Sequence, residues 1–225
     1  MSCPSIPIRY MRQLLVIFDL DGTLVDSESL CNQAFLDLLP SLNESVEELV
    51  DQFRGKRLSE ILCDIEHKIS SPLPEGFEQR YRQRVAELFA TELRPVEGVP
   101  EMLKTLEFPF CIASSGPPEK IKNALTATQL APFFGQRFFS SYVVGSWKPD
   151  PGLFLHAAAA MGFTPANCVV VEDSPVGLEA AASARMRALH YAPSFKTSKN
   201  NHTFSSMSEL PSILLGMENA NTCPA

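Results

Sequence analysis

The chain has 225 residues, of which 45% are hydrophobic and 20% charged, as is typical of globular proteins. This length allows one core-forming domain with a smaller second one, or a single large domain. The formal net charge of -7 gives no electrostatic footprint for nucleic acid or an anionic membrane surface, so an anionic ligand must be attracted by local groups.

The cysteines and the first residues indicate the cellular compartment in which the protein is expected. The 6 cysteines show neither CxxC spacing nor a dense framework, which indicates reduced thiols. The first dozen residues hold two prolines and no continuous apolar stretch, and they predict a loose leader and no signal peptide. No run approaches the roughly 18 apolar residues of a membrane span. We expect a cytoplasmic monomer that binds a small molecule and neither nucleic acid nor membrane.

Short apolar runs predict strands at 14–20, 108–114, 138–144, 167–171 and 186–191. From residue 108 onward, helical patterns at 118–130, 152–161 and 176–184 separate them. Strands that alternate with helices pair in parallel, with both sheet faces covered. The predicted class is therefore α/β, with a Rossmann-like doubly wound parallel sheet. The polar tail after Ala192 is predicted to be loop, apart from a short helix at 207–215.

The first gap between strands differs, because it holds helical patterns at 30–39, 45–53, 58–69 and 77–93. In the last of these, apolar side chains share one face (Phe77, Tyr81, Val85, Leu88 and Phe89), and the arginines at 80, 82 and 84 are interpreted as mostly solvated. The sequence thus predicts a four-helix insert. The predicted domains are an α/β core, 1–26 and 95–225, and an α-helical domain, 27–94.

The first apolar run, LLVIFDLDGTLVDSE, ends in Asp19 and Asp21. Ligands of open parallel sheets bind beyond the carboxyl ends of the strands, and alternation places these two side chains on the same side. One carboxylate could attack phosphorus while the other donates a proton to the leaving oxygen and later activates water. An ordinary Asp-Gly turn is the structural alternative.

Polar residues also follow the next two runs. Ser114, Ser115 and Gly116 precede a predicted helix, where a hydroxyl and free amides form an anion site or a plain N-cap. Lys148, in SWKPDP after the third run, could neutralise a phosphate and an attacking carboxylate, or be a surface loop residue.

The run VVVEDSPVG repeats the pattern of the first, with Glu172 and Asp173 after three valines. Clustered carboxylates of this kind suit Mg²⁺, although Asp173 could instead cap the following helix. All four groups are predicted at the carboxyl ends of strands of one sheet, which favours a functional site over four separate coincidences.

The order DLDGT, SSG, KPDP and ED resembles the four motifs of the haloacid dehalogenase (HAD) superfamily of phosphohydrolases, over residues 14–192. The resemblance implies Asp19 as the nucleophile that forms an aspartyl-phosphate and Asp21 as the general acid and base. It implies Ser114 with neighbouring amides as the phosphoryl clamp and Lys148 as the charge-neutralising lysine. Mg²⁺ is then held by Asp19, the Asp21 carbonyl, Asp173 and, directly or through water, Glu172. The helical insert resembles the small cap of this superfamily.

Within the superfamily, FRGKRLSEIL, VAELFATEL and SSYVVGSWKPDP resemble the sugar-phosphate phosphatases, and more narrowly the bacterial 6-phosphogluconate phosphatases. Lys56 and Arg57, in a predicted cap loop, could bind a substrate carboxylate or hydroxyls, or be solvated charges beside a turn.

Two alternatives to a phosphatase stay open. A β-phosphoglucomutase-like enzyme shares core and cap, but such mutases usually carry a histidine where this chain has Cys31. A catalytically silent binding or regulatory protein would be expected to lack Asp19 or Asp21, and both are present.

Overall fold

The computed structural model describes residues 13–193 and 202–222. In these ranges, parallel strands form one sheet in the order β3-β2-β1-β4-β5-β6. The strands are β1 (Leu15–Phe18), β2 (Phe110–Ser114), β3 (Phe138–Ser140), β4 (Cys168–Glu172), β5 (Arg187–Tyr191) and β6 (Thr203–Phe204). The chain runs outward from β1 to β3 and then continues on the other side of β1 with β4. The predicted doubly wound parallel sheet is confirmed.

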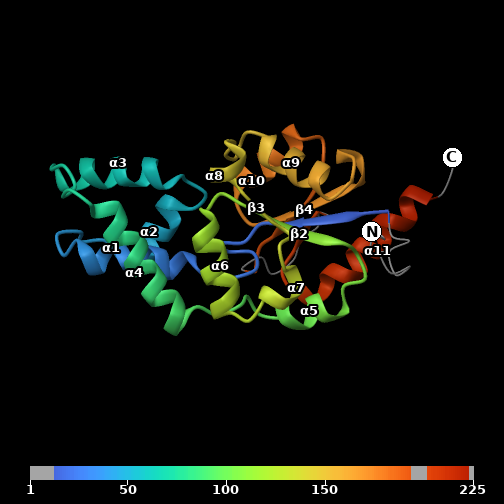
Figure 1. Ribbon diagram of the computed structural model, residues 1–225, viewed down its shortest axis with the longest axis horizontal. Coiled ribbons are helices and arrows are strands. Elements are labelled where there is room, and N and C mark those ends of the chain that lie inside the picture. The colour runs from blue at the N-terminus through green and yellow to red at the C-terminus, as the bar shows by residue number, and fades with distance from the viewer. Residues whose placement is uncertain (1–12, 194–201, 223–225) are drawn as a thin grey trace, which may run out of the picture.

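Helices cover both faces of the sheet (Figure 1). One face carries α9 (Gly152–Ala160) and α10 (Pro175–Ser183), and the other carries α5 (Val99–Thr105), α7 (Ala131–Phe134) and α11 (Leu210–Thr222). Leu15 and Ile17 are buried in the cluster under α9 and α10, whereas Val16 and Phe18 belong to the cluster on the opposite face. Because both faces are buried, β1 is a continuous apolar run and does not alternate.

Between β1 and α5, the chain forms helices that lie together at one end of the molecule (Figure 1). They are α1 (Glu28–Leu38), α2 (Val46–Phe53), α3 (Leu58–Ile69) and α4 (Phe77–Glu92), and we refer to residues 27–94 as the insert. Aromatic rings pack at its centre: Phe35 stacks on Tyr81 with centroids 4.1 Å apart and meets Phe53 edge-on at 6.2 Å. The predicted apolar face of α4 is buried.

The insert leaves and re-enters the core at adjoining points. The Asp26 amide donates to the Arg94 carbonyl at 3.1 Å, and the Val96 amide donates to the Leu24 carbonyl at 3.0 Å. Val25 and Pro95 accordingly form an antiparallel bridge. The two connections therefore run side by side, so the helices between them leave the pairing of β1 with β2 undisturbed.

Two predicted elements need correction. The strand predicted at 138–144 is wrong in its second half, because Ser140 accepts a hydrogen bond from the Tyr142 amide at 3.2 Å and starts α8 (Ser141–Val144). In the tail, β6 was missed, because its 2 residues show no periodicity. The terminal helix α11 also runs beyond residue 215, and residues 194–201 lie outside the described ranges.

The remaining expectations concern disulfide bonds, membrane-spanning helices and the leader. Among the residues described, Cys31, Cys63, Cys111 and Cys168 are free thiols. In the same part of the chain, no helix is both long and apolar enough to cross a membrane. The predicted leader, residues 1–12, lies outside the described ranges.

Candidate active site

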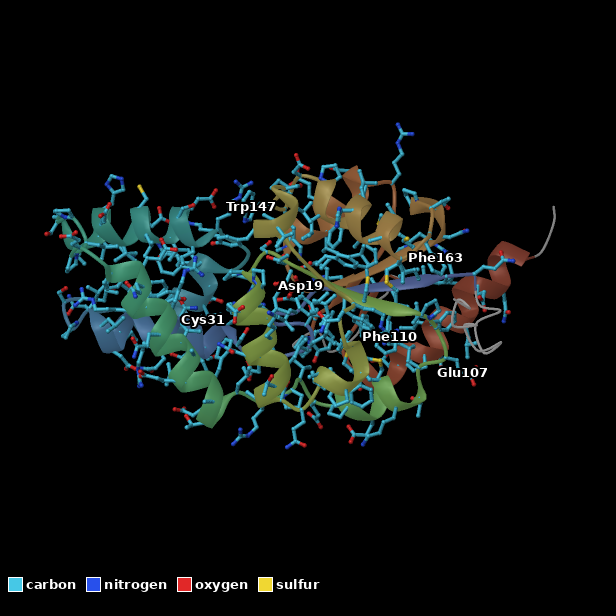
Figure 2. All side chains as sticks on the ribbon, viewed as in Figure 1. Asp19, Cys31, Glu107, Phe110, Trp147 and Phe163 are labelled. Carbon is cyan, nitrogen blue, oxygen red and sulfur yellow. The ribbon has the colours of Figure 1, made fainter. Side chains whose placement is uncertain are left out.

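A cavity of about 600 Å³ lies between the insert and the carboxyl ends of β1, β2 and β4. This is the point at which the strand order reverses, where doubly wound sheets bind their ligands. Figure 2 shows Asp19 at the end of β1, with Cys31 on the side of the insert. Most of the predicted site residues line this cavity: Asp19, Asp21, Lys56, Arg57, Ser115, Gly116, Lys148, Glu172 and Asp173.

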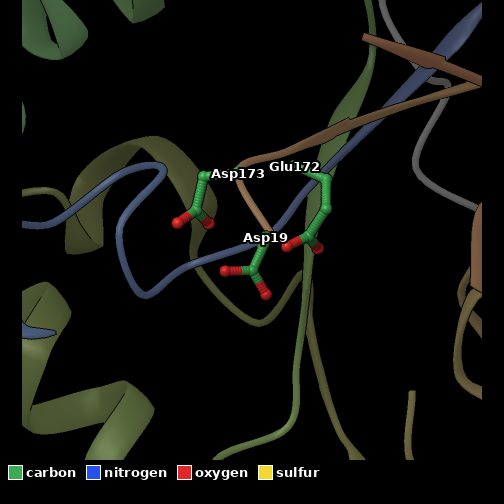
Figure 3. A group of neighbouring side chains, drawn as sticks. All are labelled: Asp19, Glu172 and Asp173. Atoms are coloured by element: carbon green, nitrogen blue, oxygen red, sulfur yellow. The ribbon is translucent and has the colours of Figure 1, made fainter. Parts of the chain in front are cut away.

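Asp19, Glu172 and Asp173 form a buried acidic cluster. Figure 3 shows these side chains gathered at the ends of their strands, and one oxygen from each lies within 4.8 Å of the others. Burial, reinforced by the charge of Glu172, raises the pKa of Asp19 well above its usual value. Burial and the charges of Glu172 and Glu28 raise the pKa of Asp173 to about 7. Ionising these carboxylates together is therefore unfavourable, and a bound cation would offset that cost.

Lys148 binds two members of the cluster. Its ammonium donates to Asp19 Oδ1 and, at 2.6 Å, to Glu172 Oε2. Burial alone would lower the pKa of Lys148, but the charges of Asp19 and Glu172 raise it, so the side chain stays charged. Lys148 was predicted to follow a strand directly. It lies instead on the loop after α8, because β3 ends at Ser140.

The turn after β1 packs against Asp173. Gly22 has a φ of +79°, and a Cβ on this residue would lie 2.4 Å from Asp173 Oδ2. The Thr23 hydroxyl donates to Asp173 Oδ1 at 3.1 Å. Glycine is thus required for both the backbone conformation and the close approach, and the threonine joins the ends of β1 and β4.

The start of α10 fixes Glu172. Ser174 donates to Glu172 Oε1 from its amide at 3.1 Å and from its hydroxyl at 2.7 Å. Ser174 also caps α10, since its Oγ accepts a hydrogen bond from the Gly177 amide at 3.2 Å. The alternative in which Asp173 caps this helix is therefore wrong.

Asp21 has a different environment from Asp19. Its Oδ1 accepts hydrogen bonds from Lys120 Nζ at 2.7 Å and from the Ser27 hydroxyl. Burial opposes ionisation, but the charge and hydrogen bond of Lys120 and the hydrogen bond from Ser27 outweigh it, so the pKa of Asp21 is lowered. Sequence analysis missed Lys120, because a lysine in the first turns of α6 (Pro118–Ala127) has the pattern of a solvated charge.

Only part of the SSG segment lines the cavity. Ser114 is fully buried, and its hydroxyl accepts a hydrogen bond from the Gly116 amide at 3.0 Å. The Gly116 carbonyl accepts a hydrogen bond from the Ser140 hydroxyl at 2.6 Å. Ser115 and Gly116 line the cavity, just before α6. The hydroxyl of Ser114 thus shapes the loop.

The loop between α2 and α3 brings three cations to the cavity: Arg54, Lys56 and Arg57. Arg54, which sequence analysis missed, bridges Glu28 at 3.0 Å and Asp173 at 3.3 Å. Lys56 pairs with Asp64 at 2.7 Å. Arg57 lies over the ring of Trp147, 5.3 Å from its centroid.

Gly177 offers a direct test of the Glu172 environment. A Cβ there would lie 2.1 Å from Glu172 Cδ, and Lys148 and Ser174 hold that carboxylate in place. We expect Gly177→Ala to lower the free energy of unfolding by about 1–3 kcal/mol, the usual cost of overpacking. Urea denaturation measures this change.

The matched control is Gly216→Ala in α11, because a Cβ there meets nothing within 4 Å. This helical position should gain up to about 1 kcal/mol from alanine. A Gly177→Ala variant as stable as the wild type would show that Glu172 is not held as described.

Residues 14–185 match the haloacid dehalogenase-like hydrolase family. The chain is 34% identical over 206 residues to 6-phosphogluconate phosphatase of Escherichia coli K12, covering 88% of this chain and 93% of that protein. It is 33% identical over 188 residues to hexitol phosphatase B of the same strain, covering 79% of this chain and 83% of that protein.

Solved structures agree. A conserved haloacid dehalogenase-like protein of unknown function from Agrobacterium tumefaciens superposes with a TM-score of 0.76 and 32% identity, covering 90% of this chain and 98% of that one. The match spans the core and the insert alike. The chain therefore belongs to the haloacid dehalogenase-like hydrolase family.

Proposed function

We propose that the chain is a Mg²⁺-dependent phosphomonoester hydrolase that acts on a small sugar phosphate, with 6-phosphogluconate as the first candidate. One observation carries the proposal: the buried carboxylate of Asp19 faces the cavity and is bound by Lys148, beside two further acids. The names of the two curated relatives, both phosphatases of phosphorylated carbohydrates, support the substrate class.

The donor set fits Mg²⁺. The site gathers more carboxylates (Asp19, Asp21, Glu172 and Asp173) than cations that contact them (Arg54, Lys120 and Lys148). Asp19, Asp173 and the Asp21 carbonyl would hold the ion. Glu172 would act directly or through water. When bound, Mg²⁺ neutralises part of the negative charge of the phosphoryl group and the carboxylates.

The residues of the chain divide the reaction into two steps. Asp19 attacks phosphorus, so that an aspartyl-phosphate forms as the bond to the leaving oxygen breaks, and Asp21 donates a proton to that oxygen. Water then attacks phosphorus, Asp21 accepts the proton of the water, and the bond between phosphorus and Asp19 breaks. The pKa of Asp21, lowered by Lys120 against the effect of burial, leaves this carboxylate ionised, as a group that accepts a proton must be.

Other groups hold the phosphoryl group and exclude water. We infer that the loop of Ser114, Ser115 and Gly116, the last two of which line the cavity, clamps the phosphoryl oxygens, while Lys148 neutralises Asp19. Residues 27–94 then act as a cap domain over the core of residues 1–26 and 95–225. A cap that closes over the cavity keeps bulk water from the aspartyl-phosphate.

Cys31 favours hydrolysis over a mutase. The residue lines the cavity at the position where such mutases usually carry histidine, and burial raises the pKa of its thiol. A thiol that stays protonated near neutral pH cannot replace a histidine as a proton carrier. The contacts of Asp19, Asp21 and Lys148 also argue against a catalytically silent protein.

Replacing the proposed nucleophile is the first test. Asp19→Asn removes the attacking carboxylate, so turnover of a sugar phosphate should fall at least about a thousandfold. The unfolding midpoint should stay close to that of the wild type, because asparagine has the same shape and relieves repulsion by Glu172. Phosphate release and thermal unfolding measure the two effects. The exposed Asp26→Asn is the control, and near-normal turnover by Asp19→Asn would refute the assignment.

Metal binding can be tested without turnover. Adding Mg²⁺ to the metal-free protein should raise its Tm, by the equivalent of about 2.7 kcal/mol at a hundredfold excess over Kd. Asp173→Asn should reduce this rise, because it removes a ligand. The exposed Glu101→Gln should retain it. An equal rise in all three proteins, at matched ionic strength, would place the ion elsewhere.

A further inference from the structure

Arg57 differs from the other cations around the cavity. No described carboxylate forms an ion pair with its exposed guanidinium. Asp150 accepts hydrogen bonds from the Gly152 amide at 2.8 Å and from Ser146 at 2.7 Å, which lower its pKa, and the charge of Arg57 adds a smaller effect without an ion pair. The remaining described cations that line the cavity are each paired with a carboxylate: Arg54, Lys56, Arg82, Lys120 and Lys148. Arg57 is therefore the cation best placed to accept an anionic group from a ligand.

Trp147 holds Arg57 at the cavity wall. The guanidinium lies 5.3 Å from the centroid of the indole ring, a cation–π contact between the insert and the core. Contact with an aromatic face leaves the N–H groups at the edge of a guanidinium open for two parallel hydrogen bonds to a carboxylate. Figure 2 shows Trp147 where the insert meets the core.

The indole is held by a ring contact and by its neighbour in the chain. Tyr142 meets it edge-on with ring centroids 5.6 Å apart, and Arg82 of α4 donates to the Tyr142 hydroxyl at 2.9 Å. In the sequence, Trp147 directly precedes Lys148, whose ammonium is bound to Asp19. The position of Arg57 is thus tied, through one aromatic side chain, to the proposed nucleophile.

We propose that Arg57 and Trp147 form a carboxylate subsite, in which Trp147 positions Arg57 to bind an acidic group at the end of the substrate remote from its phosphate. The inference rests on the proposed phosphatase function and adds the residues that select an acidic sugar phosphate over a neutral one. Lys56, tied to Asp64, is not the selecting cation.

Two substrates isolate the carboxylate: 6-phosphogluconate and sorbitol 6-phosphate share the carbon chain, and the second has a hydroxymethyl group in place of the carboxylate. We expect the wild type to prefer 6-phosphogluconate roughly tenfold in kcat/KM, as a charge-assisted bidentate contact allows. Arg57→Gln and Trp147→Leu should lower kcat/KM for 6-phosphogluconate about tenfold more than kcat/KM for sorbitol 6-phosphate, which abolishes the preference. Trp147→Phe should retain most of it, because it keeps an aromatic face.

Arg80→Gln is the matched control. Arg80 is an exposed arginine of the insert that lies over Phe77, 6.0 Å from the ring centroid, and does not line the cavity. It should keep the wild-type preference.

A second measurement needs no turnover. The chain contains 1 tryptophan, so intrinsic fluorescence reports on Trp147 alone. Titration should show tighter binding of 6-phosphogluconate than of sorbitol 6-phosphate in the wild type, and Arg57→Gln should remove the difference. If the wild type hydrolyses neither compound but binds 6-phosphogluconate through Arg57, the subsite stands and the proposed hydrolysis falls.

Three results would overturn the subsite. Hydrolysis of both substrates without preference would retain the phosphatase and reject the carboxylate contact. If Arg57→Gln lowered kcat/KM equally for both substrates, the contact of Arg57 with Trp147 would only hold the insert on the core. Absence of any fluorescence response and of turnover in the wild type would reject both proposals.

Discussion

The contact of Lys148 with Asp19 and Glu172 is the interaction on which the site depends. Three carboxylates lie together at the ends of β1 and β4, and burial adds to the cost of ionising Asp19 and Asp173. One buried ammonium that binds two of them offsets part of this cost. Neighbouring hydroxyls add to this, since Thr23 donates to Asp173 Oδ1 and Ser174 donates to Glu172 Oε1.

The pKa values of two aspartates only two positions apart are thereby shifted in opposite directions. Asp19 faces other acids, and burial together with Glu172 raises its pKa. Asp21 faces Lys120 and Ser27, which lower its pKa against the effect of burial. Neighbouring groups, and not residue type, separate the two carboxylates. Such a separation is the usual basis for assigning different roles to paired acids.

The sequence was most informative where a buried strand ends in polar residues. Asp19, Glu172 and Asp173 were predictable, because an acid after an apolar strand of a parallel sheet must lie at the ligand-binding edge. Lys120 and Trp147 were not assigned, because a helical lysine and a loop aromatic acquire their roles only through distant contacts. The short β6 and the helical turn α8 were missed because neither is long enough to show a period. The loop role of the Ser114 hydroxyl likewise depends on a backbone turn that composition does not specify.

The side-by-side arrangement of Leu24–Asp26 and Arg94–Val96 has an evolutionary consequence. A segment whose two ends adjoin can be exchanged for another of different length or shape without altering the register of the sheet. The residues proposed to bind the phosphoryl group and the metal lie at the sheet edge, whereas much of the remaining cavity wall belongs to the exchangeable segment. Substrate preference can therefore diverge among descendants of one ancestor while the chemistry stays the same.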